Sequence, residues 1–222
     1  MPAEPTTAPP PSERATVRRL AYRGSYERDT AYAILDEALV CHVGLATEQG
    51  PVVIPTLYAR DGDRLLLHGS VASRLLRGAS KAEVCVTVTL IDSLVLARSW
   101  FHHSVDYRSV VVFGQATRVD DPAEKRAALE HFVESVVPGR TAESRPPTEV
   151  ELKQTIVLAL PLDEFSVKVR DMGVVDEPED MSLPVWAGRI PVGLAAGTPI
   201  PDDDNLPDLP VPSHASTYRR GR

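Results

Sequence analysis

Short apolar stretches that alternate with polar positions fill the middle of the chain, and they predict strands. Residues 40–69 alternate Val, Ile, Leu and Thr with polar residues, and two Gly-containing turn sequences, QGP at 49–51 and DGD at 61–63, interrupt them. Alternation broken by such turns is typical of antiparallel strands joined by short loops. We therefore expect a three-stranded antiparallel meander over this part of the chain.

Further stretches rich in β-branched residues predict more strands. They lie at residues 82–92, 93–100, 109–120 and 155–172, and the last is long enough for two strands. The connections have the character of turns, and no regular alternation of strand and helix is visible. Because closing a sheet removes its exposed edges, an antiparallel barrel is the economical arrangement of so many short strands.

A few helices interrupt this β pattern. Residues 29–39 carry apolar side chains at helical spacing, and a short helix is expected at 71–78. Asp121 and Pro122 provide an N-cap and a proline at the first helical position, which predicts a helix from there to about Val137. The sequence therefore predicts a mainly β fold with flanking helices.

The two ends of the chain differ in composition from its middle. Residues 1–16 are rich in Pro, Thr and Ala, and residues 201–222 are polar and rich in Pro. Neither end has an apolar period, so neither can bury enough apolar surface to fold by itself. We expect disordered tails at 1–16 and 201–222 around one folded domain, residues 17–200.

Charge and composition exclude several classes of function. The net charge is -7 and the pI is about 5.4, so no basic surplus exists to neutralise a nucleic-acid backbone. No apolar run is long enough to span a bilayer, and the N-terminal stretch lacks the apolar core of a secretory signal. Two cysteines outside any CxxC pair suit a reducing compartment. We expect a cytoplasmic protein that binds neither nucleic acid nor membrane.

The stretch LLLHGSVASR, which ends at Arg74, is the main candidate for chemistry. It passes from an apolar strand to small hydroxyl residues and one cation within six positions. Gly69 lets a ligand approach the main chain, and Ser70 is placed to cap the following helix. Ser73 and Arg74 lie in the first turn, where helix amides and a guanidinium attract phosphate. A phosphate cradle with His68 as a functional imidazole and a merely capped surface helix both stay open.

Two further features point to a ligand. Pro55 interrupts a predicted strand, and a proline there marks an edge or a bulge because it removes a backbone donor. The stretch SWFHHSVDYRSVVVFG, residues 99–114, gathers aromatic residues and histidines in a chain with only 5% aromatics, which suits a ligand wall. His102 and His103 could instead bind a metal, but neighbouring residues of an extended chain point in opposite directions.

Taken together, these stretches resemble the pyridoxamine 5'-phosphate oxidase-like, FMN-binding split-barrel proteins, in particular the flavin-nucleotide-binding and nitroimidazole-resistance-like branch. The resemblance covers residues 22–192 and rests on four segments: VVIPTLYARDGDRLLLHGSVASRLLR, HHSVDYRSVVVFGQA, FSVKVRDMG and LPVWAGRIPV. It implies an antiparallel split β-barrel that binds FMN at the interface of a homodimer.

The same resemblance implies a role for individual residues of this chain. The isoalloxazine ring of FMN would lie along Val53, Ile54, Pro55 and Thr56. The FMN phosphate would be held by His68, Gly69, Ser70, Ser73 and Arg74. The pocket would be completed by Ser104, Tyr107, Arg108 and Ser109. Near the flavin, in part from the partner subunit, would lie Lys168, Trp186 and Arg189.

The implied function is a flavin-dependent oxidoreductase that acts on an unidentified small molecule. FMN supplies the electron or hydride transfer, so the protein needs neither a catalytic triad nor a metal set. A Ser-Arg-Lys run follows the phosphate strand in pyridoxamine phosphate oxidases proper, whereas this chain has Ser73-Arg74-Leu75, which argues against that substrate. A deazaflavin or heme in place of FMN, a non-catalytic carrier or sensor, and a structural dimer with an empty pocket stay as alternatives.

Overall fold

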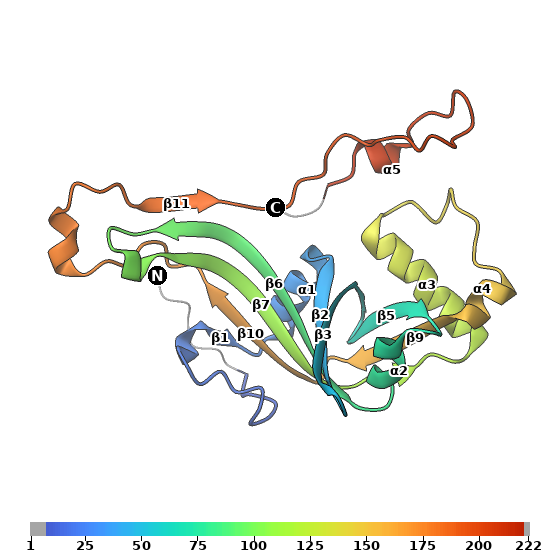
Figure 1. The fold of residues 1–222 in the computed structure, drawn as a ribbon, viewed down its shortest axis with the longest axis horizontal. Coiled ribbons are helices and arrows are strands. Elements are labelled where there is room, and N and C mark those ends of the chain that lie inside the picture. Colours follow the sequence, from blue (N-terminus) through green and yellow to red (C-terminus); the bar gives the residue numbers. More distant parts are fainter. Residues whose placement is uncertain (1–7, 220–222) are drawn as a thin grey trace.

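Two antiparallel sheets and a few short helices form the folded part of the chain (Figure 1). The structure, a computed structural model, describes residues 8–219. The first seven residues and the last three, which belong to the tails expected to be disordered, lie outside the described residues. The predicted mainly β fold with flanking helices is confirmed.

The larger sheet runs in the order β1-β10-β7-β6-β2-β3, and β11 pairs with β6 outside this path. Its strands are β1 (Gly24–Ser25), β2 (Val40–Thr47), β3 (Gly50–Leu57), β6 (Glu83–Leu96), β7 (Ser104–Gln115), β10 (Glu164–Arg170) and β11 (Gly188–Pro191). The smaller sheet runs in the order β4-β5-β9-β8. Its strands are β4 (Ala59–Asp61), β5 (Arg64–Ser70), β8 (Thr117–Arg118) and β9 (Thr155–Pro161).

Helices lie at the ends and on the flanks of the sheets. The α-helices are α1 (Arg28–Glu37), α2 (Arg74–Ala79), α3 (Pro122–Val136), α4 (Glu149–Gln154) and α5 (Ser213–Ser216). The 3-10 turns are η1 (Ala21–Arg23), η2 (Trp100–His102) and η3 (Pro178–Ser182). The cap predicted for the long helix is present, because the Asp121 carboxylate accepts the amide of Glu124 at 2.8 Å.

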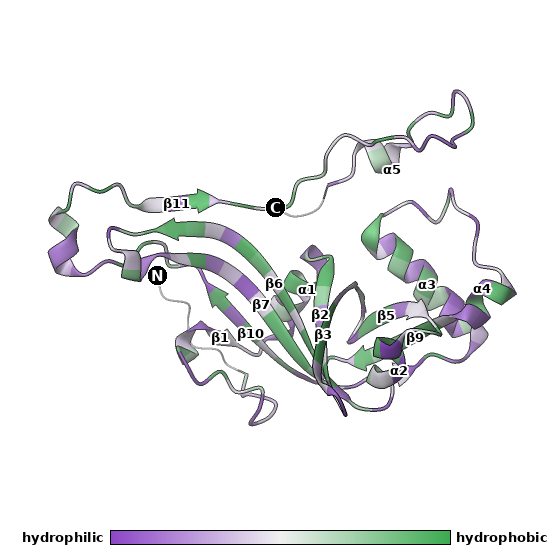
Figure 2. Cartoon of the chain, in the orientation of Figure 1, coloured by the Kyte–Doolittle hydropathy of each residue, from purple (hydrophilic) through white to green (hydrophobic). Residues whose placement is uncertain are grey.

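The main hydrophobic core lies between the two sheets and is closed by α1. Ile34 and Leu35 of α1 are each 1% exposed, and they pack with buried valines and leucines of both sheets. A second cluster lies on the other face of the smaller sheet, where Leu66 packs with Phe132 of α3. Figure 2 shows the alternation of apolar and polar bands along β6 and β7 that such two-sided strands require.

The predicted meander over residues 40–69 is wrong in one respect. β3 pairs with β2, but the chain then crosses at Tyr58 to the smaller sheet, where β4 and β5 pair with each other. Tyr58 is 2% exposed and its hydroxyl donates to the Leu35 carbonyl at 2.6 Å, so burial of this side chain pins the crossing. β3 is therefore an edge strand, as the proline at position 55 predicts.

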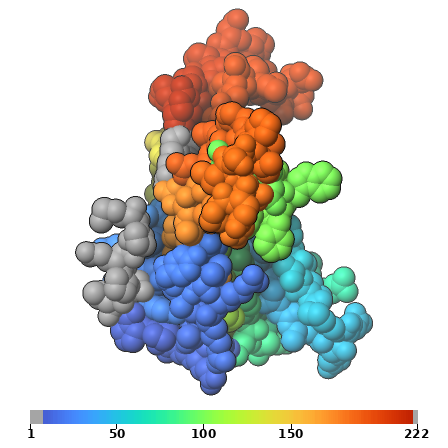
Figure 3. Space-filling view, turned by 90° about the vertical axis from the view of Figure 1, so that its left-hand side faces the viewer, coloured from blue at the N-terminus to red at the C-terminus, as the bar shows by residue number. Residues whose placement is uncertain are grey.

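The two strands expected at 82–92 and 93–100 form one strand, β6, with a shift of register between Ile91 and Ser93. The bulged residue, Asp92, turns its carboxylate to the guanidinium of Arg108 on β7, which explains why pairing continues through the irregularity. The outer half of β6 then pairs with β11, and Figure 3 shows the C-terminal segment standing above the rest of the chain.

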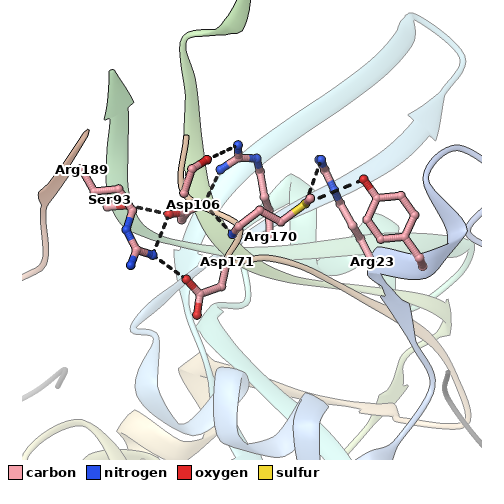
Figure 4. Close-up of polar contacts among 9 residues, drawn as sticks. Arg23, Ser93, Asp106, Arg170, Asp171 and Arg189 are labelled. Carbon is pink, nitrogen blue, oxygen red and sulfur yellow. Dashed lines mark hydrogen bonds and ion pairs between the residues drawn. The ribbon is translucent and has the colours of Figure 1, made fainter. Parts of the chain in front are cut away.

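A buried carboxylate joins β7, β10 and β11 (Figure 4). Asp106 on β7 is 1% exposed and forms an ion pair with Arg170 of β10, which is 5% exposed. The carboxylate also accepts the Ser93 hydroxyl at 2.8 Å and contacts Arg189 of β11 at 3.3 Å. Burial acts to raise the pKa of Asp106, but these hydrogen bonds, that of the Met172 amide and the charge of Arg170 outweigh it and lower the pKa.

We predict that Asp106→Ala lowers the free energy of unfolding by about 3–5 kcal/mol, because it leaves the guanidinium of Arg170 buried without its carboxylate. Chemical denaturation measures this loss. The matched control is Asp163→Ala, which removes a carboxylate that is 81% exposed and should change stability by no more than about 0.5 kcal/mol. Equal losses in the two variants would mean that the buried pair does not hold this part of the fold together.

Candidate functional site

His68 lies on β5, in the middle of the smaller sheet. Leu65 and Leu67 face the main core, so Leu66 and His68 face the opposite side, toward α3. The imidazole ring meets the ring of Phe132 edge-on, with the ring centroids 4.2 Å apart. Its Nδ1 atom is buried and has no hydrogen-bond partner among the described residues. A buried polar atom without a partner costs free energy, and the same imidazole also lines a cavity.

Burial also determines the protonation state of this imidazole. Loss of hydration lowers the pKa of His68 below its ordinary value of about 6.5, so the ring is neutral at pH 7. A neutral imidazole has a free electron pair on one ring nitrogen. It can therefore accept a hydrogen bond or bind a metal ion.

A cavity of about 710 Å³ opens beside His68, between α3, α4 and the loop that joins them. This volume is within the range of roughly 300–1,000 Å³ that small-molecule pockets occupy. The apolar part of its wall consists of Leu129, Phe132, Val133, Pro146 and Pro147. The cavity thus suits a largely apolar ligand that offers a hydrogen-bond donor or a metal ion to the imidazole.

Two arginines stand in the wall of the same cavity. Arg126 donates to the carbonyl of Pro147 at 2.7 Å and forms an ion pair with Glu149 at 2.9 Å. Arg145 forms an ion pair with Glu151 at 2.6 Å. Both side chains are partly exposed, so they are placed to meet acidic groups of a ligand that projects from the cavity.

The predicted phosphate cradle lies at the end of β5, where the strand meets α2. Ser73, rather than Ser70, caps the helix, since its hydroxyl accepts the Leu76 amide at 3.3 Å and α2 begins at Arg74. The Ser70 hydroxyl instead accepts the amide of Ala72. A Cβ added at Gly69 would lie 2.9 Å from Leu76 Cδ1, so glycine allows α2 to pack on the strand. Arg74 is exposed and has no ion-pair partner among residues 8–219.

The predicted flavin wall on β3 lies at the edge of the larger sheet. Val53 is 64% exposed and Ile54 is 39% exposed, while Pro55 is exposed and Thr56 is half-buried. Apolar side chains exposed side by side along a sheet edge mark a surface that a ligand or a partner chain covers. Nothing else in the described part of the chain pairs with this strand except β2.

The predicted residues on β7 are separated from β3 by two strands, β6 and β2, of the same sheet. Each of the three guanidinium nitrogens of Arg108 donates to a carboxylate. The carboxylate of Glu37 on α1 accepts at 2.5 and 2.7 Å, and that of Asp92 accepts at 2.7–3.2 Å. These carboxylates raise the pKa of Arg108. Ser109 donates to the Lys168 carbonyl, Tyr107 is half-buried and Ser104 is exposed. Arg108 therefore joins α1 to the larger sheet.

The remaining predicted residues are spread over the outer part of the fold. The ammonium group of Lys168 donates to the carbonyl of Arg19 at 3.2 Å. Trp186, just before β11, is 67% exposed. The structure thus places Gly69, Ser70, Ser73 and Arg74 at one strand-to-helix turn, whereas the side chain of His68, predicted to hold the phosphate with them, faces α3 instead. The predicted residues on β3 and those near β7 lie in two other places within one chain.

The adjacent histidines point to different partners. His102 Nε2 lies 3.5 Å from the carboxylate of Glu177, and His103 Nδ1 lies 3.0 Å from the carbonyl of Ser99. Within residues 8–219, no group of three or more His, Cys, Asp or Glu side chains is arranged to hold a metal ion. In that same range, no helix is both long and apolar enough to cross a membrane.

The sequence analysis missed the cavity beside His68, because it treated residues 122–154 as flanking helices. One signal was present: Leu129, Phe132 and Val133 have the spacing of one apolar helix face. Whether such a face packs fully against a sheet or leaves room for a ligand depends on the path of the following loop, which the sequence pattern does not specify.

Comparisons with known proteins agree with this geometry. A model of the pyridoxamine 5'-phosphate oxidase family matches residues 27–169, so the chain belongs to this family, and its fold is the antiparallel split barrel. The resemblance stated from the sequence is confirmed. A search of curated proteins finds no match to the chain.

Two solved structures are similar over most of the chain. The flavocytochrome Anf3 from Azotobacter vinelandii is 39% identical, with a TM-score of 0.90 over 96% of this chain and 99% of that one. The FAD and heme binding protein from Mycobacterium smegmatis is 34% identical, with a TM-score of 0.83 over 86% of this chain and 95% of that one.

We predict a specific pH dependence for the stability of the cofactor-free protein. The unfolded chain binds a proton at His68 near pH 6.5, while the folded chain resists it, so this residue destabilises the fold as pH falls below about 6.5. His68→Leu should lose less stability between pH 7 and pH 5, with a slope shallower by up to about 1.4 kcal/mol per pH unit. Denaturation at each pH measures the slopes. The exposed His103, changed to Leu, serves as control, and equal slopes for wild type and His68→Leu would contradict the assignment.

Proposed function

We propose that this protein is an oxidoreductase that binds a flavin and a heme in one chain. The observation that carries the proposal is the half-buried imidazole of His68 in the wall of a cavity of about 710 Å³ that aromatic, aliphatic and proline side chains line. Two relatives that are similar over most of the chain support it, a flavocytochrome and an FAD and heme binding protein. The sequence analysis named heme only as an alternative to FMN, whereas the proposal assigns the two cofactors to separate places.

Heme fits the groups that surround the cavity beside His68. A neutral imidazole is a common axial ligand of heme iron. The apolar rings and prolines of the wall suit the faces of the macrocycle, and Arg126 and Arg145 are placed to bind its two carboxylates. Heme supplies one-electron chemistry when bound. The chain itself provides the ligand, the apolar wall and the charges at the mouth.

For the flavin, we propose the site at the end of β5 and the start of α2. Ser70, Ser73 and Arg74 offer hydroxyl groups and a cation without an ion-pair partner in the described residues, which suits a phosphate. The sequence analysis named FMN, and one relative is an FAD and heme binding protein. Both flavins carry the phosphate next to the ribityl chain, so the cradle suits either. Mass spectrometry of the extracted flavin distinguishes them.

A homodimer would complete this flavin site. The exposed apolar face of β3 and the groups on β7, β10 and β11 are apart within one chain, so a second copy is needed to bring one set against the other. The outer segment that carries Trp186 extends from the body of the fold and can reach across such an interface. We therefore propose a homodimer in which each flavin contacts both subunits.

The reaction we propose is electron transfer to or from a small molecule through the flavin. A flavin exchanges one or two electrons and a heme exchanges one, so the pair suits the coupling of a two-electron donor to one-electron steps. A carrier or sensor on the same fold is the second candidate, and turnover with a nicotinamide donor and a quinone or nitro-aromatic acceptor separates the two. We also propose a cytoplasmic location, since both cysteines are free thiols, as is usual in a reducing compartment.

We predict that His68→Ala loses the Soret band of heme and keeps the absorbance of the flavin. Removal of the imidazole that would bind the heme iron should weaken heme binding by at least tenfold, roughly the smallest effect seen when groups around a metal ligand are changed. Heme titration of the purified protein measures this. His103→Ala, at an exposed histidine, should bind heme as the wild type does, and a full Soret band in His68→Ala would remove His68 from the site.

We predict that Arg74→Ala weakens flavin binding by about 1.5–3 kcal/mol, which is the range for a hydrogen bond to a charged group. Fluorescence titration of the cofactor-free protein with FMN and with FAD measures the loss. Arg18→Ala, at a guanidinium that is 72% exposed and far along the chain, is the control. Unchanged flavin affinity in Arg74→Ala would exclude this arginine from the phosphate site.

A further inference from the structure

Residues 213–218, near the end of the described chain, lie against the loop beside the His68 cavity. We call residues 137–148, which join α3 to α4, the cavity loop. Residues 200–211 are all exposed, and the next residues, around α5, become half-buried. In Figure 1, α5 lies on the same side of the molecule as α3 and α4.

The cavity loop supplies much of the wall next to His68. Thr141, Ser144, Arg145, Pro146 and Pro147 all line the cavity. Any movement of this loop away from α3 therefore opens the cavity to solvent, and any contact that holds the loop in place keeps the cavity closed.

The inner contacts of the cavity loop come from α3 and α4. The carboxylate of Glu134 accepts the amides of Gly139 at 2.7 Å and Thr141 at 2.9 Å, together with the Thr141 hydroxyl. These bonds, led by that of the hydroxyl, lower the pKa of Glu134. The far end of the loop is held by the ion pair of Arg145 with Glu151. The loop thus has a fixed base at each end.

Residues of the C-terminal segment contact the end of α3 that leads into the cavity loop and the loop itself. The hydroxyl of Tyr218 donates to the carbonyl of Val136 at 2.9 Å, where α3 ends. His214 Nδ1 lies 3.7 Å from the carboxylate of Glu143, and the His214 side chain is only 9% exposed. A Cβ added at Gly139 would lie 3.4 Å from His214 Cβ, so the loop and the segment are in close contact.

We propose that residues 213–218 are a latch that holds the cavity loop closed and so governs the entry and release of the ligand bound by His68. The identity of that ligand as heme rests on the proposed function, whereas the contact of the latch with the loop does not. The latch is joined to the fold by an exposed segment, so it can leave the loop without unfolding either sheet. Its release exposes the wall on which the cavity depends.

Hydrogen exchange of the full-length chain, with and without heme, tests the latch directly. Tyr218→Phe removes one hydrogen bond, and His214→Ala removes the packing against the loop. Each should speed amide exchange in residues 137–148 by roughly three- to tenfold, the effect of losing about one hydrogen bond. Leu206→Ala changes a side chain of the same segment that is 74% exposed and should have no effect. Unchanged exchange in both latch variants would overturn the proposal.

Release of heme to excess apomyoglobin tests what the latch controls. Both latch variants should release heme faster than the wild type by a factor similar to the change in amide exchange. Faster exchange with an unchanged release rate would overturn control of the ligand by the latch. A wild-type protein that takes up no heme would contradict the proposed function, and the exchange result on the heme-free chain would then decide the latch alone.

Discussion

The alternation of side chains along β5 decides which of its residues face the main core and which face α3 and the cavity. Leu65 and Leu67 are fully buried in the main core and Leu66 is fully buried on the other face, so a shift by one residue would turn the polar His68 into the main core. That constraint turns His68 to the opposite face, against Phe132 and the cavity. The same strand ends at Gly69 and leads directly into the exposed start of α2. One strand therefore carries an imidazole on one face and a cationic turn at its end.

The arginines of this fold differ in whether a carboxylate is paired with them, and this difference indicates which of them is available to a ligand. Arg108 is held by two carboxylates, and Arg170 by the carboxylate of Asp106 and the carbonyl of Gly173, so both join elements of the fold. Arg74, at the start of α2 just after β5, has no such partner among the described residues. Since a guanidinium already held by two carboxylates has little left to offer a phosphate, the unpaired arginine is the better candidate for an anionic ligand.

Much of the fold could be predicted from local sequence patterns. The helix after Asp121 follows from its cap and proline, and the edge position of β3 follows from Pro55. The pairing of strands was harder. The crossing at Tyr58 depends on a hydroxyl that finds the carbonyl of Leu35, more than twenty residues away, and no local pattern predicts such a partner. The bulge at Asp92 is similar: its carboxylate pairs with Arg108 on the next strand, so the sequence analysis, which could not predict that partner, expected two strands where there is one.

By itself, the sequence determined the order of strands and helices, the membership of the family and the stretch around His68, because these depend on residues that are neighbours along the chain. Only the tertiary structure decided which polar groups have partners. Arg108 meets Glu37 across 71 positions, and the cavity beside His68 is lined by residues of α3, α4 and the loop between them, which lie far from His68 along the chain. Two side chains pair when the fold brings them close in space, and local patterns along the sequence do not specify which distant residues become neighbours.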